Sequence, residues 1–332
     1  MQVLLTGARG FLGRALTQAL LQAGHQLRAL VRQESPLLSK LGVQQHIGDA
    51  AALDDVCAAA EGCEAIVHAA GLIDPLASVE ALYEANVRST DCMLAACELA
   101  AVPRLLLTSC ASVVLGQAEA AGVDESCPYP SRWTSAYVHT KALAEQRVLA
   151  ANSAQLATCV LRPHLLWGAG ESQLLPALLD QAARGKLRLF GDPDARIDAC
   201  HVDSAAHAHV LALARLQAGA TIAGKAYFIA QDEPLSIANF INGLLRAGGF
   251  PPETRRLSAL GARAFSAAAR SGGEQTTPLL NPYLLELFSH ASWFDLAAAR
   301  RDLDYRPSVS NAEGMNRLFT QLTRERMHGR AT

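Results

Sequence analysis

The stretch that decides the fold is Thr6–Gly13, which reads TGARGFLG near the start of the chain. It follows an apolar segment, Gln2–Thr6, that is typical of a buried strand. It leads into Phe11–Ala23, whose apolar residues have helical spacing. Three glycines between a strand and a helix are typical of a loop that binds dinucleotide phosphates, because a helix N-terminus offers unpaired N–H groups. The stretch therefore predicts a nucleotide-binding α/β sheet.

Each glycine of this loop stands where a side chain would obstruct binding. Gly7 permits the tight turn, Gly10 lets the backbone approach a pyrophosphate, and Gly13 allows close packing of helix against strand. A purely structural turn would not need three glycines at this spacing. We expect the loop to contact the cofactor through Gly7, Arg9, Gly10, Phe11, Leu12 and Gly13.

The first half of the chain alternates short apolar runs with longer amphipathic stretches. Further strands are expected at His25–Arg32, Val43–Ile47, Ala65–Ala70, Arg104–Ser109 and Thr158–Leu161. Long helices are expected at Val79–Ala100 and Ser135–Ala151. Strands separated by such helices pair in parallel through right-handed crossovers, in a sheet covered on both faces. The expected fold class is a doubly wound parallel Rossmann sheet of the α/β class.

After Pro163 the pattern changes, because glycine and proline become denser and the strands shorter. We expect a dinucleotide-binding domain over residues 1–165 and a smaller α+β substrate-binding domain over residues 166–332, with residues 200–230 returning to the first sheet. Arg255–Arg270 is amphipathic, which fits a domain helix, a lid or a membrane-surface helix. The other elements expected here are helices at Leu174–Arg184, Ala205–Leu216 and Ser236–Ala247 and strands at Lys186–Phe190 and Ala226–Ala230.

Composition excludes several classes of function. The 332 residues include 29 Lys and Arg against 31 Asp and Glu, a net charge of −2, so no basic surface for nucleic acid is expected. The sequence shows no export signal and no apolar run long enough to span a membrane. The eight cysteines are scattered without a C-x-x-C pair, which favours free thiols in a reducing compartment, and we expect a cytoplasmic protein.

No metal site is expected. His207 and His209 lie two apart on a predicted helix, roughly 200° apart around its axis, so they cannot share one ion. The sequence contains no other His, Asp and Glu set with ligand spacing.

The second expected strand ends at Arg32. A positive residue there suits the 2′-phosphate of NADP, whereas an acidic one suits the 2′-hydroxyl of NAD. Arg32, assisted by Arg9, therefore favours NADP, although a solvated surface arginine is the alternative. Asp49 is expected near the adenine amine, and Ala69, Ala70 and Gly71 keep the wall beside the cofactor small.

Tyr137 and Lys141 lie four residues apart at the start of a predicted helix, which places the phenol and the ammonium on one face. A nearby cation, together with an oxidised nicotinamide, favours the ionised phenol and makes it an acid and base near neutral pH. Such a pair occurs often by chance, but after the fifth strand of a nucleotide-binding sheet it indicates a reacting pair.

On these residues the whole chain resembles the extended short-chain dehydrogenases/reductases. The resemblance implies that Tyr137 exchanges the substrate proton and that Lys141 holds the nicotinamide ribose and lowers the tyrosine pKa. A Ser or Thr at the end of the fifth strand orients the carbonyl in that family. Here Cys110 takes this position, and a thiol is a weak donor. Strand alternation turns Ser109 away from Cys110, so Ser112 is the more plausible substitute. Cys110 as a small packing residue is the alternative.

The segments Leu161–Gly168, Val202–His209 and Gly224–Ile229 resemble the 3β-hydroxysteroid dehydrogenase-like branch of this superfamily. Within it the likeness is greatest to the ketone reductases of bacterial long-chain olefin biosynthesis. That resemblance implies NADPH-dependent hydride transfer to the C3 ketone of a hydrophobic 2-alkyl-3-oxoalkanoic acid. The alternatives are a 3β-hydroxysteroid or sterol-4-carboxylate dehydrogenase, and a non-catalytic NADP-sensing regulator.

Further expectations concern the substrate end and the partners. Pro163 and His164 are expected to contact the nicotinamide or the substrate, and Arg196 and His164 are candidates for a substrate carboxylate. Sugar-nucleotide dehydratases of the superfamily carry an Asp-Glu pair where this chain has Ala111 and Ser112, so dehydration is disfavoured. By resemblance we also expect a homodimer and association with other enzymes of the olefin pathway.

Overall fold

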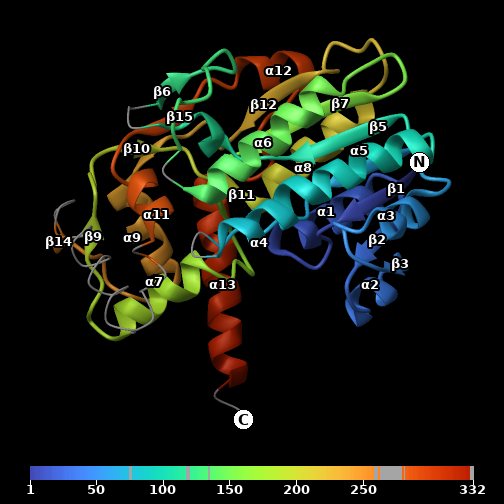
Figure 1. Cartoon of the computed structure of the whole chain (residues 1–332). Coiled ribbons are helices and arrows are strands. Elements are labelled where there is room, and N and C mark those ends of the chain that lie inside the picture. Colours follow the sequence, from blue (N-terminus) through green and yellow to red (C-terminus); the bar gives the residue numbers. More distant parts are fainter. Residues whose placement is uncertain are drawn as a thin grey trace.

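The computed structural model describes residues 1–74, 77–116, 120–133, 135–257, 261, 279 and 281–329. Seven strands form its main sheet: β1 (Gln2–Thr6), β2 (Gln26–Val31), β3 (Gln44–Ile47), β4 (Ala65–His68), β5 (Arg104–Thr108), β7 (Ala157–Pro163) and β12 (Lys225–Ile229). All neighbours pair in parallel, in the order β12-β7-β5-β4-β1-β2-β3 (Figure 1). The doubly wound α/β fold is confirmed, and β12 joins the sheet from beyond residue 166.

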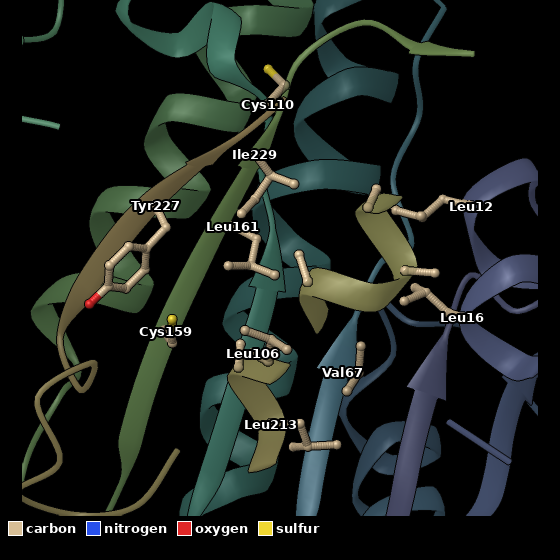
Figure 2. Packing of buried hydrophobic residues seen from close by; sticks show 14 of the residues in the cluster. Leu12, Leu16, Val67, Leu106, Cys110, Cys159, Leu161, Leu213, Tyr227 and Ile229 are labelled. Atoms are coloured by element: carbon tan, nitrogen blue, oxygen red, sulfur yellow. The ribbon is translucent and has the colours of Figure 1, made fainter. Parts of the chain in front are cut away.

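Helices cover both faces of this sheet. One face carries α1 (Phe11–Gln22) and α8 (Val202–Arg215), and the other carries α3 (Leu53–Ala60), α5 (Ser89–Leu99) and α6 (Ala136–Ala150). In Figure 2, Leu12 and Leu16 of α1 lie in one apolar layer with Val67 of β4, Leu106 of β5 and Leu213 of α8. Burial on both faces explains why these strands are apolar throughout. The short α2 (Pro36–Lys40) leads into β3.

A second apolar core lies beside the main sheet. It is built around α7 (Leu174–Ala183), α9 (Ile237–Ala247) and α11 (Pro282–Leu287), and its largest buried side chains include Trp167 and Phe240. The described strands outside the main sheet are β6 (Ala120–Val123), β8 (Leu166–Trp167), β9 (Leu189–Phe190), β10 (Arg196–Ile197), β11 (Cys200–His201), β13 (Leu235–Ser236), β14 (Arg256–Leu257) and β15 (Ser292–Phe294). The chain continues through α12 (Ala297–Leu303) and α13 (Asn311–Gly329). Among the described residues, none of the helices has the length and apolar character needed to cross a bilayer.

The helix expected at Val79–Ala100 is interrupted. It is α4 (Val79–Tyr83), one π-helical turn (Glu84–Arg88) and α5. The π turn carries Asn86, whose Oδ1 accepts from Leu72 N at 2.8 Å and whose Nδ2 donates to Leu72 O at 3.2 Å. The sequence did not predict this turn, because a single π-helical turn inside a long helix has no residue pattern of its own.

Other differences are smaller. The strand expected at Thr158–Leu161 extends over Ala157–Pro163, because Pro163 pairs with Ile229 at the end of β12. The strand expected at Lys186–Phe190 is reduced to β9. The helix α3 was not expected, and α8 begins three residues earlier than the sequence pattern predicted. Of the stretch Arg255–Arg270, residues 258–260 and 262–270 lie outside the described residues, so its interpretation stays open.

One buried ion pair joins α6 to β7. The Glu145 carboxylate accepts two hydrogen bonds from the Arg162 guanidinium, at 2.9 and 2.5 Å, and a third from the Tyr129 hydroxyl at 2.6 Å. The Glu145 side chain is 0% exposed and that of Arg162 is 5% exposed. The pair is strongly coupled, because removing one partner leaves the other charge buried without compensation.

We therefore predict that Glu145→Gln lowers the free energy of unfolding by about 3 kcal/mol, because the Arg162 charge then stays buried without its counter-charge. Urea unfolding followed by circular dichroism measures the change. The control is Glu325→Gln on the exposed side of α13, which should alter stability by less than about 0.5 kcal/mol. Equal losses for the two variants would contradict this prediction.

Candidate active site

The glycine loop packs directly against the end of β4. Gly7 has a φ of +75°, and a Cβ at that position would lie 2.7 Å from Ala70 N. A Cβ on Gly13 would lie 1.9 Å from Gly7 O, which no side chain tolerates. The turn between β1 and α1 therefore has the backbone-on-backbone packing that the sequence predicted, and it places Ala69 and Ala70 beside the loop.

The N-terminus of α1 is open toward this loop. Gly10 is its N-cap, with no side-chain cap among the described residues and no acidic residue in the first turn. Gly10 N–H is bonded to Gly7 O at 2.9 Å, so the next N–H groups, those of Phe11 and Leu12, have no intrahelical acceptor. A helix end of this kind fits a pyrophosphate, since both its N–H groups and its dipole favour an anion.

A buried polar chain fixes the strand ends behind the loop. Thr6 Oγ1 accepts from Ala70 N at 3.1 Å and donates to His68 Nδ1 at 2.7 Å. His68 Nε2 donates to Ser89 Oγ at 3.3 Å, because the Ser89 hydroxyl itself donates to Ala85 O. Burial, with the nearby Lys141 charge, lowers the pKa of His68 to about 3, so the imidazole is neutral. This series of hydrogen bonds was not predicted from the sequence.

Arg9 and Arg32 lie together at the end of β2. Arg9 Nη1 donates to Gln33 O at 3.4 Å, and Arg32 Nε lies 3.6 Å from Asp49 Oδ2. The Arg32 side chain is 77% exposed, so its guanidinium is accessible to a ligand. The structure thus brings three of the expected cofactor-binding residues together, Arg9, Arg32 and Asp49, and the last two form an ion pair.

The expected reacting pair, Tyr137 and Lys141, lies on the buried face of α6. Tyr137 and Lys141 are one turn apart and are 5% and 7% exposed. Lys141 Nζ donates to Thr108 O, the last carbonyl of β5, at 2.6 Å. The Thr108 hydroxyl donates to His209 Nε2 at 2.8 Å, because His209 Nδ1 donates to Ala205 O. The end of β5 therefore positions Lys141 through a main-chain carbonyl.

The surroundings of Tyr137 set the direction in which its pKa shifts. Burial, followed by the neighbouring Cys110 and Tyr283, raises the pKa of Tyr137 well above its ordinary value. Burial also lowers the pKa of Lys141, whose Nζ is bonded to Thr108 O. Desolvation of the phenolate is the largest of these effects, so Tyr137 is a protonated phenol at neutral pH. The ionised phenol expected from the sequence concerns the protein with an oxidised nicotinamide bound, and it stays a prediction.

Cys110 lies two residues beyond β5, as the N-cap of a 3₁₀ turn, at the position where the resemblance led us to expect Ser or Thr. Figure 2 shows it at the upper end of the apolar layer. Burial raises the pKa of its thiol to about 11, so it stays protonated. Ser109 donates its N–H to Leu161 O at 2.7 Å and its side chain is buried. Ser112, in the 3₁₀ turn Ala111–Val114, has its Oγ 3.2 Å from the Tyr283 hydroxyl.

Two residues of this cluster were not found from the sequence. Asn86, on the π turn, donates to Thr140 Oγ1 at 3.0 Å, and a Cβ on Gly71 would lie 2.9 Å from Asn86 Oδ1 and 3.8 Å from Lys141 Nζ. Tyr283, on α11, packs edge-on against the Tyr137 ring with centroids 5.5 Å apart. No local sequence signal marks either residue, since each acts through contacts with distant parts of the chain.

His164 and Arg196 are placed apart from this cluster. The His164 side chain is 0% exposed, donates from Nδ1 to Asp198 O at 3.2 Å and packs edge-on against Phe294. Burial lowers the pKa of His164 to about 4. Arg196 is exposed and donates to Pro234 O at 3.1 Å. Neither side chain has a contact that brings it to Tyr137.

Comparison with known proteins agrees with this geometry. The model of the 3-beta hydroxysteroid dehydrogenase/isomerase family matches residues 4–259. A 2-alkyl-3-oxoalkanoate reductase of Stenotrophomonas maltophilia (strain K279a) is 41% identical over 331 residues, which cover 96% of this chain and 98% of that protein. A 3 beta-hydroxysteroid dehydrogenase/Delta 5-->4-isomerase of Mycobacterium tuberculosis (strain ATCC 25618 / H37Rv) is 33% identical over 347 residues, covering 98% and 93%.

The fold is also found among solved structures. MoeE5 in complex with UDP-glucose and NAD superposes with a TM-score of 0.75 at 24% identity, over 98% of this chain and 100% of that one. Fold, reacting pair and relatives lead to the same assignment. The chain belongs to the 3-beta hydroxysteroid dehydrogenase/isomerase family of extended short-chain dehydrogenases/reductases, and it is an oxidoreductase of CH–OH and ketone groups.

Proposed function

We propose that the protein is an NADPH-dependent reductase that transfers hydride to the C3 ketone of a hydrophobic 2-alkyl-3-oxoalkanoic acid, giving the 3-hydroxy acid. The observation that carries the proposal is the buried pair of Tyr137 and Lys141, held at the end of β5 by the Lys141–Thr108 hydrogen bond. The name of the S. maltophilia relative, 41% identical along nearly the whole chain, supports this substrate class.

The proposed cofactor is NADPH. The Thr6–Gly13 loop and the uncapped N-terminus of α1 fit a pyrophosphate, and Arg32 with Arg9 supplies positive charge at the end of β2 for a 2′-phosphate. When bound, the nicotinamide supplies the hydride. Lys141 holds the nicotinamide ribose in this proposal, which its position beside Gly71 supports.

The protein's own residues then handle the developing alkoxide. Tyr137, kept protonated by burial, donates its phenolic proton to the oxygen that was the carbonyl oxygen. The Ser112 hydroxyl, close to Tyr137 through Tyr283, orients that oxygen in place of the family's Ser or Thr. The closed surroundings of this cluster exclude water, which strengthens each of these hydrogen bonds.

A 3β-hydroxysteroid dehydrogenase is the second candidate, favoured by the 33% identical M. tuberculosis relative and by the family match. Purified protein is assayed for NADP⁺ reduction with a 2-alkyl-3-hydroxyalkanoic acid, with a 3β-hydroxysterol and with NAD⁺ in parallel. The assay is run in the oxidation direction because the 3-keto acids that would be the starting compounds for reduction lose CO₂ spontaneously. Turnover of the hydroxy acid with NADP⁺ supports the proposal, and turnover of the sterol alone replaces it with the second candidate.

Location and assembly are further parts of the proposal. The eight cysteines are free thiols, which supports a reducing compartment such as the cytoplasm. We also propose a homodimer, because α4 and α5 carry exposed apolar side chains, with Val79 60% and Leu99 69% exposed. In Figure 1 these helices lie beside α6 on one face of the molecule. Association with other enzymes of the olefin pathway stays a prediction.

The first prediction from this function concerns the phenol. Tyr137→Phe should lower kcat by at least about 100-fold, because the general acid is lost, while the NADPH dissociation constant stays unchanged. Steady-state kinetics and fluorescence titration with NADPH measure the two quantities. Tyr83→Phe, on the surface of α4, is the matched control and should keep full activity. A Tyr137→Phe variant that keeps the wild-type kcat would show that Tyr137 is not the general acid.

The second prediction concerns cofactor choice. Arg32→Ala should raise the dissociation constant of NADPH by about 10- to 100-fold and leave that of NADH nearly unchanged, because only the 2′-phosphate loses a charged partner. The control is Arg184→Ala, which changes an exposed arginine at the C-cap of α7 and should leave both dissociation constants unchanged. Equal weakening of both cofactors, or of neither, would show that Arg32 does not select NADP.

The third prediction follows from the raised pKa of Tyr137. A raised pKa keeps the phenol protonated as the pH rises, so the free protein should show no ionisation of Tyr137 below about pH 10, the ordinary phenol value. The measurement is the tyrosinate absorbance of the native protein minus that of Tyr137→Phe across the alkaline range. An ionisation near pH 7 in this difference would mean that Lys141 dominates over burial.

A further inference from the structure

The hydroxyl groups of Ser112 and Tyr283 form a pair beside the reacting phenol, with their oxygens 3.2 Å apart. We propose that Tyr283 is a positioning residue: its hydroxyl donates to Ser112 Oγ and thereby directs the Ser112 proton toward the substrate carbonyl oxygen. This inference rests on the proposed ketone reduction. In this arrangement the hydroxyl expected at the position of Cys110 is replaced by two hydroxyls, those of Ser112 and Tyr283, which come from two parts of the fold.

The need for this pair arises at Cys110. Its thiol is 7% exposed and neighbours the Tyr137 side chain, at the position where the family resemblance leads us to expect a hydroxyl. A thiol is a weak hydrogen-bond donor, and burial keeps this one protonated, so it offers little stabilisation to an oxygen that gains negative charge. A hydroxyl donor close to the same point is required for efficient polarisation of the carbonyl.

The direction of the hydrogen bond follows from acidity. A phenol is a stronger acid than an aliphatic alcohol and therefore the better donor, so Tyr283 donates and Ser112 Oγ accepts. An accepting hydroxyl is polarised and donates its own proton more strongly to a third group. Burial raises the pKa of Tyr283, which keeps its phenol in the donating form throughout the neutral and mildly alkaline range.

The position of the pair also fits this role. Ser112 lies two residues beyond Cys110 in the 3₁₀ turn, and the Tyr283 ring meets the Tyr137 ring at an interplanar angle of 81°. Tyr283 comes from α11, in the second apolar core, so the part of the chain expected to bind substrate also sets the donor. A small, mainly apolar cavity adjoins the pair and is lined by Ser112, Leu115, Val138, Tyr283, Glu286 and Leu287.

The test uses the full-length enzyme with whichever substrate it turns over, the 2-alkyl-3-hydroxyalkanoic acid or the 3β-hydroxysterol. Tyr283→Phe keeps the ring and its contact with Tyr137 but removes the hydroxyl. It should lower kcat by about 10- to 100-fold, with a smaller change in KM and no change in the NADPH dissociation constant. Ser112→Ala should cause at least the same loss, and the double variant should lose no more than Ser112→Ala alone.

A rescue variant separates positioning from mere packing. Cys110→Ser restores a hydroxyl at the family's position, so it should return most of the lost activity to Tyr283→Phe. A packing defect would not be corrected by this change. Wild-type activity in Tyr283→Phe, independent losses in the double variant, or failure of Cys110→Ser to restore activity would each overturn the inference. If the wild-type enzyme turns over neither substrate, the proposed function fails, and the role of Tyr283 falls with it.

Discussion

Two buried contacts hold α6 against the sheet: Lys141 Nζ donates to Thr108 O, and the Glu145 carboxylate is bonded to the Arg162 guanidinium. Because Tyr137, Lys141 and Glu145 recur every four residues, one face of the helix carries both the proposed reacting pair and its anchor. The anchor reaches β7 and the reacting pair reaches the end of β5. A shift of α6 that displaced the Tyr137 phenol would therefore also separate Glu145 from Arg162 and leave a buried charge without its partner.

The cofactor side of the site depends on equally close packing. The loop between β1 and α1 touches Ala69 and Ala70 without any intervening side chain, and Thr6 and His68 connect the ends of β1 and β4 by hydrogen bonds. The low pKa values of His68 and His209, both lowered mainly by burial, keep these imidazoles neutral. Each then has a defined tautomer, so the strand ends behind the site are fixed by directional bonds.

The sequence predicted the features that depend on local patterns. The glycine loop, the parallel pairing implied by alternating elements, and the spacing of Tyr137 and Lys141 all follow from short-range periodicity or from a motif. The π turn that carries Asn86 and the contact of Ser112 with Tyr283, 171 residues away, were not predictable because no local pattern encodes them. The effect of burial on the pKa of Tyr137 was also not predictable, since it depends on how deeply the finished fold buries the phenol.

The central claim is that this fold brings a ketone oxygen to the hydroxyls of Tyr137 and Ser112. A crystal structure of the Tyr137→Phe protein with NADP⁺ and a 2-alkyl-3-hydroxyalkanoic acid tests it most directly. We predict the C3 hydroxyl oxygen about 2.6–3.2 Å from Ser112 Oγ, beside the residue 137 ring, with the pyrophosphate at the N-terminus of α1. A ligand whose oxygen contacts only the Cys110 thiol, or that binds away from α6, would contradict the account.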